Sequence, residues 1–428
     1  MTLHGPRFFV GKTMSMQSVM PPGDRRLRMF LWIFLALFLL GLGWSTVYRV
    51  AWDDVTHTDY TVYRVAGQAA LDGRNIYTVQ NEHGWNYVYP PPFAVLMALL
   101  AHIPLAMGAL LWYLLEIASV ALSLIMAVNL LGPAVAERHK LVLYGLPLLY
   151  LSTLLVSGIM RCQASEFVIV LVIAAFYAHL RGRPLLAGLS LALAVVIKVF
   201  PLALLAYFVL RRQWYTVVAT LLCTVLLLVL PSLFWGWQQN TLYLHEWLEV
   251  VGRPALMSNA DRLTATPLYG QLMNTCKGRN QSLESLFLTL GTGASYTMGL
   301  VAAVGGLMLV LMGLAARRVR HQADELLLCS AFIIWQLLLP PVSETHYFGM
   351  LILPLVVILG LLLQEGRAAR AALYGLGALM VAAMVLIGFH LTEVFRPLCL
   401  ACLVIWVGLL RRLLMTETRL SESVYEAG

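Results

Sequence analysis

An aspartate just after the first long apolar run is the strongest candidate for chemistry in this sequence. Asp59 lies in the polar segment His57–Tyr63, which follows an apolar stretch from Met29 to Val47. A carboxylate at the edge of a bilayer is energetically costly, so such a residue commonly has a function. Asp59 is therefore the first functional candidate. The alternative is an ordinary hydrated acid of a loop.

A single lysine interrupts an apolar segment near the middle of the chain. Lys198 lies within Val195–Pro201, where every other residue is apolar. A lysine in such surroundings needs an anion, and a lipid-linked phosphate is the anion that a membrane cavity offers. The alternative is a lysine whose ammonium group snorkels to the outer headgroups.

Neutral polar side chains and a histidine also occur where apolar runs begin or end. Amide groups are suited to binding sugar hydroxyls, although each could instead have a structural role. His346 begins a run directly after Pro340-Pro341, and it could contribute to a site or simply cap a helix. The residues predicted to contact a substrate, besides Lys198, are Tyr60, Arg64, Tyr89, Gln163, Asn280, Gln281 and His346.

The composition places the chain in a membrane. Of its 428 residues, 60% are hydrophobic and 12% are charged, and its mean hydropathy is +0.80. Soluble domains carry about 25% charged residues, so a soluble domain is excluded. The net charge of +8 comes from basic residues scattered as doublets between apolar runs, which indicates topology signals and no nucleic-acid partner.

The basic doublets determine the predicted topology. If all of them face the cytoplasm, an even number of spans separates neighbouring doublets. The apolar stretch 91–102 is too short to cross a hydrocarbon core of about 30 Å, so it is predicted to be a juxtamembrane helix of the first outer loop. The result is about twelve transmembrane helices. All the polar residues at the span ends then lie on one outer side: Asp59, Arg161, Gln163, Glu166, Lys198, Asn280, Gln281, Glu344 and His346.

These spans predict an all-α polytopic membrane protein with three parts. Residues 1–28 form a cytoplasmic N-terminal segment that leads into a retained signal anchor, because no small-residue cleavage site follows the first apolar run. Residues 29–413 form the transmembrane domain, with large outer loops at about 49–104 and 236–295. Residues 414–428 form a cytoplasmic tail.

The remaining motifs exclude several classes of site. No Walker-type glycine-rich loop, H-E-x-x-H or G-x-S-x-G sequence occurs. Cys399 and Cys402 form a C-x-x-C within an apolar run without a second pair, which indicates packing and no metal or redox centre. Cys162 and Cys276 both fall in predicted outer regions, so they are either two thiols or a disulfide.

Five motifs together resemble a known family. They are the Asp59 loop, Gln163 after a polar turn, Ala187-Gly188-Leu189 followed by Lys198-x-Phe-Pro, Asn280-Gln281-Ser282-Leu283, and His346-Tyr347. In this order they resemble the GT-C fold, polyprenol-phosphate-dependent enzymes of glycosyltransferase family 87, in the branch of the mycobacterial mannosyltransferases of phosphatidylinositol mannoside synthesis. The chain departs from the family pattern at Arg161-Cys162, where a small residue is common.

The resemblance implies an inverting glycosyltransferase of the GT-C type. It would move mannose or another hexose or pentose from a polyprenyl-phosphate-linked donor to a lipid or envelope-glycan acceptor, with Asp59 as the base. No cofactor and no metal is required, because the leaving phosphate is already anionic and needs only cations. The implied location is the bacterial inner membrane, with the active site facing outward.

A secondary transporter or flippase of a lipid-linked or small anionic substrate is the rival interpretation. Transporters also hide polar residues within apolar helices, but they typically have a midplane site at broken helices and two related halves. No internal repeat is evident in this sequence. A lipid-binding scaffold without catalysis is a third interpretation, and it would tolerate the loss of Asp59.

Overall fold

The computed structural model of the chain describes residues 22–53, 58–257, 261, 278–365, 370–389, 391 and 395–425. These residues are predominantly helical, and no β-strand occurs among them. Two isolated β-bridges are formed, one between Gln80 and Asn86 and one between Asn280 and Glu344. The described residues therefore confirm the predicted all-α fold.

The chain forms two units, residues 1–44 and 45–428. The first unit contains most of the apolar helix α1 (Pro22–Ala51). The second unit contains the end of that helix and every other described helix, and it holds the candidate site.

Eight helical segments of the described residues are long and apolar enough to cross a bilayer. They are Met29–Ala51 of α1, α4 (Leu105–Asn129), α6 (Lys140–Met160), α10–α11 (Trp214–Val229 and Ser232–Trp235), α17 (Ala294–Ala316), η3–α19 (Thr345–Leu351 and Ile352–Gln364), α20 (Arg370–Gly388) and α22 (Pro397–Tyr425). The chain is therefore a multi-pass membrane protein. Shorter apolar helices also occur: α7 (Ser165–Leu180), α8 (Pro184–Ile197), η1–α9 (Phe200–Leu204 and Leu205–Leu210) and α18 (Gln322–Leu338).

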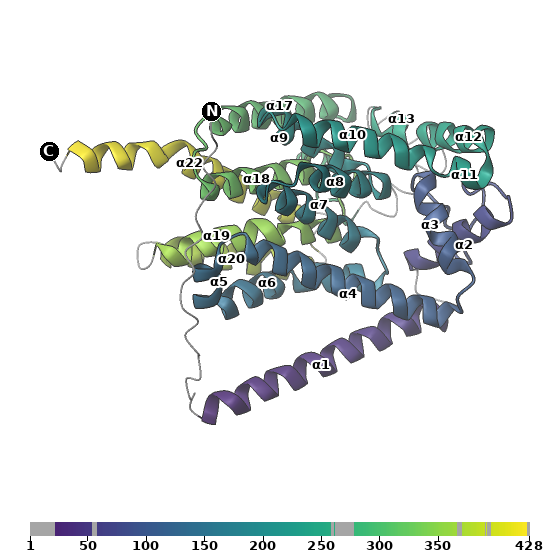
Figure 1. The fold of residues 1–428 in the computed structure, drawn as a ribbon, viewed down its shortest axis with the longest axis horizontal. Helices are drawn as coiled ribbons and strands as arrows, with labels where there is room; N and C mark the ends of the chain where they lie inside the picture. The colour runs from purple at the N-terminus through teal and green to yellow at the C-terminus, as the bar shows by residue number, and fades with distance from the viewer. Residues whose placement is uncertain are drawn as a thin grey trace, which may run out of the picture. The chain divides into compact units, whose positions relative to one another are not determined.

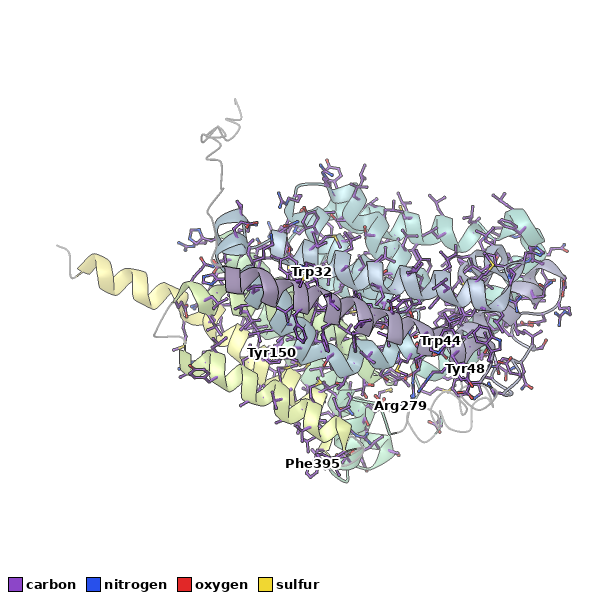
Figure 2. The ribbon with its side chains drawn as sticks, turned by 90° about the horizontal axis from the view of Figure 1, so that it is seen from below. Trp32, Trp44, Tyr48, Tyr150, Arg279 and Phe395 are labelled. Carbon is purple, nitrogen blue, oxygen red and sulfur yellow. The ribbon has the colours of Figure 1, made fainter. Side chains whose placement is uncertain are left out.

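The outer surfaces of the long helices are apolar. Leu226 of α10, Val310 of α17 and Val404 of α22 are all exposed, and the side chains drawn in Figure 2 consist mainly of carbon. In water such surfaces would be an aggregation hazard, whereas lipid tails solvate them at no cost. The exposed helix faces thus fit a hydrocarbon environment.

A helix break places Lys198 between two helices. Helix α8 ends at Ile197, Lys198 has an extended backbone, and the 3₁₀-helix η1 begins at Phe200. Pro201 explains the break, because a proline has no backbone N–H to donate to the carbonyl of Ile197 four residues earlier, and its ring clashes with that carbonyl in an α-helix. Lys198 therefore lies at an interruption of the helical backbone.

Asp59 begins a helix that packs closely on its neighbour. Helix α2 (Asp59–Leu71) crosses α3 (Pro91–Ala101), and Gly67 lies at the crossing. A Cβ atom on Gly67 would lie 2.5 Å from the carbonyl carbon of Met97, so only glycine permits this approach. The crossing fixes the position of α2 and hence of Asp59 at its first turn.

Both predicted polar loops lie at the same end of the second unit. In Figure 1, α2 and α3 of the first loop gather beside α11 and α12 (Trp237–Trp247). Hydrogen bonds join the loops: the indole of Trp235 donates to the carbonyl of Ala70 at 3.0 Å, and the hydroxyl of Tyr243 donates to the carbonyl of Arg74 at 3.1 Å. The two loops therefore form one layer over the helix ends.

The second loop continues as irregular helix. The π-helix η2 (Leu248–Gly252) follows α12, and a single helical turn, α13 (Arg253–Ala255), follows η2. Helix α16 (Leu283–Thr289) leads into α17. The short helix α5 (Pro133–Arg138) lies between α4 and α6, at the end of the unit opposite α2 and α3 in Figure 1.

Some residues of the predicted outer loops lie outside the part of the chain that the structure describes. Cys162 is buried, but Cys276 lies outside the described residues, and so do Asp54 and His57. Cys399 and Cys402 are both buried in α22. Their burial is what a packing role requires.

Candidate active site

A cavity of about 890 Å³ lies beneath the loop layer of the second unit. Its size matches the range in which proteins bind small ligands and cofactors. Its polar lining includes five residues from four parts of the chain that the sequence analysis placed at span ends: Asp59 of α2, Arg161 and Gln163 after α6, Lys198 after α8, and Glu344 before η3. The polar residues that the sequence predicts on one side of the membrane thus include five that share one cavity.

Asp59 is held by its backbone and leaves its carboxylate available. Its backbone N–H donates to the carbonyl oxygen of Arg161 at 2.9 Å. Within the described chain, no group donates a hydrogen bond to the carboxylate, which faces the cavity. Burial, and after it the charge of Glu344, raise the pKa of Asp59 to about 7, although the charges of Lys198 and Arg161 act against this rise. A carboxylate with a pKa near neutrality is suited to accept a proton.

Lys198 lines the cavity, and its side chain is buried and does not extend into bulk solvent. Its side chain is only 8% exposed. The ammonium group donates to the hydroxyl of Ser165 at 2.8 Å and to the amide oxygen of Gln163 at 3.4 Å, and it lies 4.1 Å from the ring centre of Tyr347. A snorkelling lysine would place its charge among headgroups. The observed position instead offers a cation to a ligand in the cavity.

Glu344 connects the cavity to a buried histidine. Its Oε2 atom lies 3.9 Å from Nη1 of Arg161 and 3.6 Å from Nδ1 of His346. His346 is almost completely buried, and none of the residues that the structure describes forms a hydrogen bond with either of its ring nitrogens. His346 does not line the cavity itself. The imidazole could therefore act on a ligand only through Glu344.

The amides of Asn280 and Gln281 brace the backbone that carries Glu344. Asn280 donates to the carbonyl of Pro341 at 2.7 Å and accepts from the N–H of Ser343 at 2.9 Å. The backbone N–H of Gln281 donates to the carbonyl of Ser343 at 2.7 Å. Neither residue lines the cavity. The side-chain amide of Asn280 and the backbone N–H of Gln281 therefore position the Glu344 turn, whereas the side-chain oxygen of Gln281 accepts from the backbone N–H of Leu398 at 3.1 Å.

The tyrosines and the arginine predicted in the first loop are divided between the cavity and the core. Tyr89 lines the cavity, and its hydroxyl lies 2.9 Å from that of Tyr63. Arg64 donates to the carbonyl oxygens of Ala101 and Ile103, each at 3.2 Å. Tyr60 is buried against Trp112. Of these three predicted substrate contacts, only Tyr89 lies at the cavity.

Two cavity residues were not assigned a role from the sequence. Arg161 stands out there only as a departure from a family pattern, and Glu344 only as one polar residue among nine at the span ends. Only the folded structure identifies them as site residues, because it places both in the cavity lining together with Asp59. Figure 2 labels a further lining residue, Arg279, which sequence reasoning also missed.

The described residues contain no group of three histidine, cysteine, aspartate or glutamate side chains arranged to hold a metal ion. The cavity instead presents a potential base and two fixed cations, Lys198 and Arg161, on one wall. Such a set can deprotonate a hydroxyl and stabilise an anionic leaving group.

Comparison with known proteins gives a consistent result. Residues 87–341 match the model of glycosyltransferase family 87. A relative from Mycolicibacterium smegmatis is 29% identical over 367 residues, which cover 78% of this chain and 77% of the relative. A relative from Mycobacterium tuberculosis is 28% identical over 381 residues, covering 84% of this chain and 83% of the relative. Both are named polyprenol-phosphate-mannose-dependent alpha-(1-2)-phosphatidylinositol mannoside mannosyltransferase. No solved structure matches the chain significantly.

Proposed function

Because this chain belongs to glycosyltransferase family 87, we propose that it transfers mannose from a polyprenyl-phosphate donor to a hydroxyl group of a lipid or envelope-glycan acceptor. The observation that carries this proposal is the placement of Asp59 and Lys198 on the wall of one cavity. The relatives named above use a polyprenol-phosphate-mannose donor and a phosphatidylinositol mannoside acceptor. Family membership does not favour the alternative of a transporter or flippase.

The cavity supplies the groups that an inverting transfer needs. Asp59 takes the proton from the acceptor hydroxyl as its oxygen attacks the anomeric carbon of the sugar. The bond between that carbon and the phosphate oxygen breaks, and polyprenyl phosphate leaves with the electron pair. Lys198 and Arg161 stabilise the additional negative charge that develops on the phosphate. Attack from the side opposite the phosphate inverts the configuration of the anomeric carbon.

The test is an assay of donor cleavage with the purified protein. Polyprenyl-phosphate mannose and a membrane lipid extract are incubated with the protein, and free polyprenyl phosphate and mannosylated lipid are both measured. The proposal requires both products to appear in equal amounts. A protein that instead moves the intact donor across a vesicle membrane would be a flippase.

We also propose that the chain crosses the bacterial inner membrane about twelve times. The eight long helical segments, together with α7, α8, η1–α9 and α18, give this number, with α3 left as a juxtamembrane helix. Residues 29–413 then form the membrane domain, and residues 1–28 and 414–428 are cytoplasmic. The cavity faces outward because the basic doublets lie at the opposite helix ends.

This topology predicts the accessibility of introduced cysteines. Cysteines at Gln80 and Glu82 in the first loop and at Gly291 in the second should react with a membrane-impermeant maleimide added to intact cells. A cysteine at Glu137, near the basic residues of α5, should react only after the cells are permeabilised. Labelling of Gly291→Cys only in permeabilised cells would contradict a shared outer side.

The raised pKa of Asp59 predicts a pH dependence of turnover. A base acts in its deprotonated form, so kcat/KM should fall as the pH drops through about 7. Below that pH, each unit should cost about tenfold. The donor is a phosphodiester, and its single charge does not change in this range.

Replacing Glu344 with Gln tests the origin of this pKa. The change removes a negative charge that raises the pKa of Asp59, so the acidic limb of the kcat/KM profile should move to lower pH. Glu249→Gln is the matched control, because Glu249 also lines the cavity but does not contribute to this pKa shift. A limb that stays in place in Glu344→Gln, or moves upward, would assign the limb to another group.

A further inference from the structure

The lining of the cavity contains a mainly apolar stretch that begins next to Lys198. Beyond Lys198, two segments far apart in the sequence form the wall. Val199 and Phe200 begin η1, and Leu248, Val251 and Leu256 belong to η2–α13 and the residue that follows. This apolar part of the cavity has no role in the chemistry described above.

Both segments of the apolar wall have irregular helical backbone. The residues from Leu248 to Gly252 form a π-helix, and those from Phe200 to Leu204 form a 3₁₀-helix. π-Helical turns are rare and frequently occur at functional sites. At membrane depth, irregular backbone is tolerated where it is buried in protein or lines a cavity. Two such segments at one cavity wall indicate a site built for a ligand.

The side chains of this wall are also exposed on the outside of the protein. Val199 is 38% exposed, Leu248 is 52% exposed and Leu256 is 80% exposed. Phe200 is fixed, because its ring stacks on Tyr347 with 5.1 Å between the ring centres. Residues that line a cavity and are exposed at the same time form the rim of an opening. Most of the side chains at this opening are apolar; Glu249 and Arg253 of the same segment also line the cavity and form an ion pair with each other at 3.0 Å.

We propose that the opening between η1 and η2–α13 is the exit for the isoprenoid tail of the donor, and this assignment rests on the function proposed above. The phosphate lies at Lys198, the first isoprene units contact Val199 and Leu248, and the following units pass Leu256, the most exposed of the three. Val199 follows Lys198 directly in the chain, so the apolar path starts where the phosphate binds. The isoprenoid is attached to that same phosphate, whereas an acceptor hydroxyl must approach the Asp59 carboxylate.

Two donors that differ only in tail length test the assignment. One is mannosyl phosphate on a long polyprenyl chain, and the other carries a tail of two isoprene units. For Leu248→Gln and Leu256→Gln, the KM for the long donor should rise about tenfold or more, since an apolar side chain no longer packs on the tail. The KM for the short donor should change less than twofold in Leu256→Gln, because Leu256 lies farther along the path.

Leu290→Gln is the matched control. Leu290 is 72% exposed and lies after α16, away from the cavity lining. Its replacement should leave both KM values unchanged. Equal changes for long and short donors in Leu256→Gln would overturn the tail exit, and so would a KM change confined to the acceptor. Failure of the wild-type protein to consume either donor would instead overturn the proposed function.

A second measurement uses the wild-type protein and does not depend on the folding of variants. A donor with a photoreactive group on its first isoprene units is bound and irradiated, and the labelled peptides are identified by mass spectrometry. The label should appear between residues 247 and 257 or at residues 199–202. Label confined to the exposed face of α10 or α17 would show that the tail leaves the cavity elsewhere.

Discussion

Asp59→Asn should lower kcat by about a hundred- to ten-thousand-fold, the usual contribution of a general base. Asparagine has nearly the same shape as aspartate but cannot take a proton from the acceptor hydroxyl. The backbone hydrogen bond from residue 59 to the carbonyl of Arg161 remains. No hydrogen bond to the carboxylate within the described chain is lost, so the protein should fold and bind the donor normally.

Asp72→Asn is the matched control for this loss. Asp72 ends α2 in the same outer loop, and it accepts hydrogen bonds from Gln68 and Arg74 on the surface. Turnover of this variant should stay within about twofold, as expected for a surface substitution with an effect below about 0.5 kcal/mol. Asp54→Asn addresses the nearest competitor in sequence. Turnover kept in Asp59→Asn but lost in Asp54→Asn would move the base to Asp54.

Donor binding separates a catalytic role from a structural one. The affinity of Asp59→Asn for polyprenyl-phosphate mannose should match that of the wild type, because the negative charge removed does not contact the phosphate favourably. If the variant loses donor binding and turnover together, Asp59 would have a structural role in the cavity. If it keeps both, the enzymatic assignment of this loop would fail.

The sequence alone predicts those parts of the fold that depend on the length of apolar runs. The long helices follow from runs of about 20 apolar residues, because a bilayer leaves few alternatives for such runs. The break at Lys198 also follows from the chain itself, since Pro201 and the charged side chain both disfavour a continuous apolar helix. For the same reason Asp59 and Lys198 could be proposed as functional residues before their positions were known.

Other residues at or near the cavity could not be assigned in the same way. Arg161 and Glu344 are 183 positions apart, and only tertiary packing brings their charged groups to within 3.9 Å. Asn280 shows the opposite difficulty, because an amide suits a sugar hydroxyl and a backbone carbonyl equally well. Its partner, the carbonyl of Pro341, is visible only in the folded chain. The polar type of these residues could be used in a prediction from the sequence, whereas their partners could not be predicted.

Lys198→Met should weaken donor binding about ten- to a hundred-fold. The substitution keeps an unbranched side chain of similar length and removes the positive charge. A hydrogen bond to a charged group contributes about 1.5–3 kcal/mol, which corresponds to this range of affinity. The hydroxyl of Ser165 and the amide oxygen of Gln163 lose one partner each, and the amide of Gln163, which lines the cavity, can bond to water there instead. The variant should therefore still insert into the membrane.

The measurement is the Kd of the purified variant for polyprenyl-phosphate mannose, with Lys140→Met as the matched control. Lys140 is exposed at the start of α6, and it pairs with Glu137 at 3.6 Å, outside the cavity. The control should bind the donor as the wild type does. A donor that lacks the phosphate should bind both variants and the wild type with equally low affinity, because the interaction removed is the one with the phosphate. Unchanged donor affinity in Lys198→Met would leave the ammonium group with a packing role against Tyr347 and would transfer the phosphate contact to Arg161.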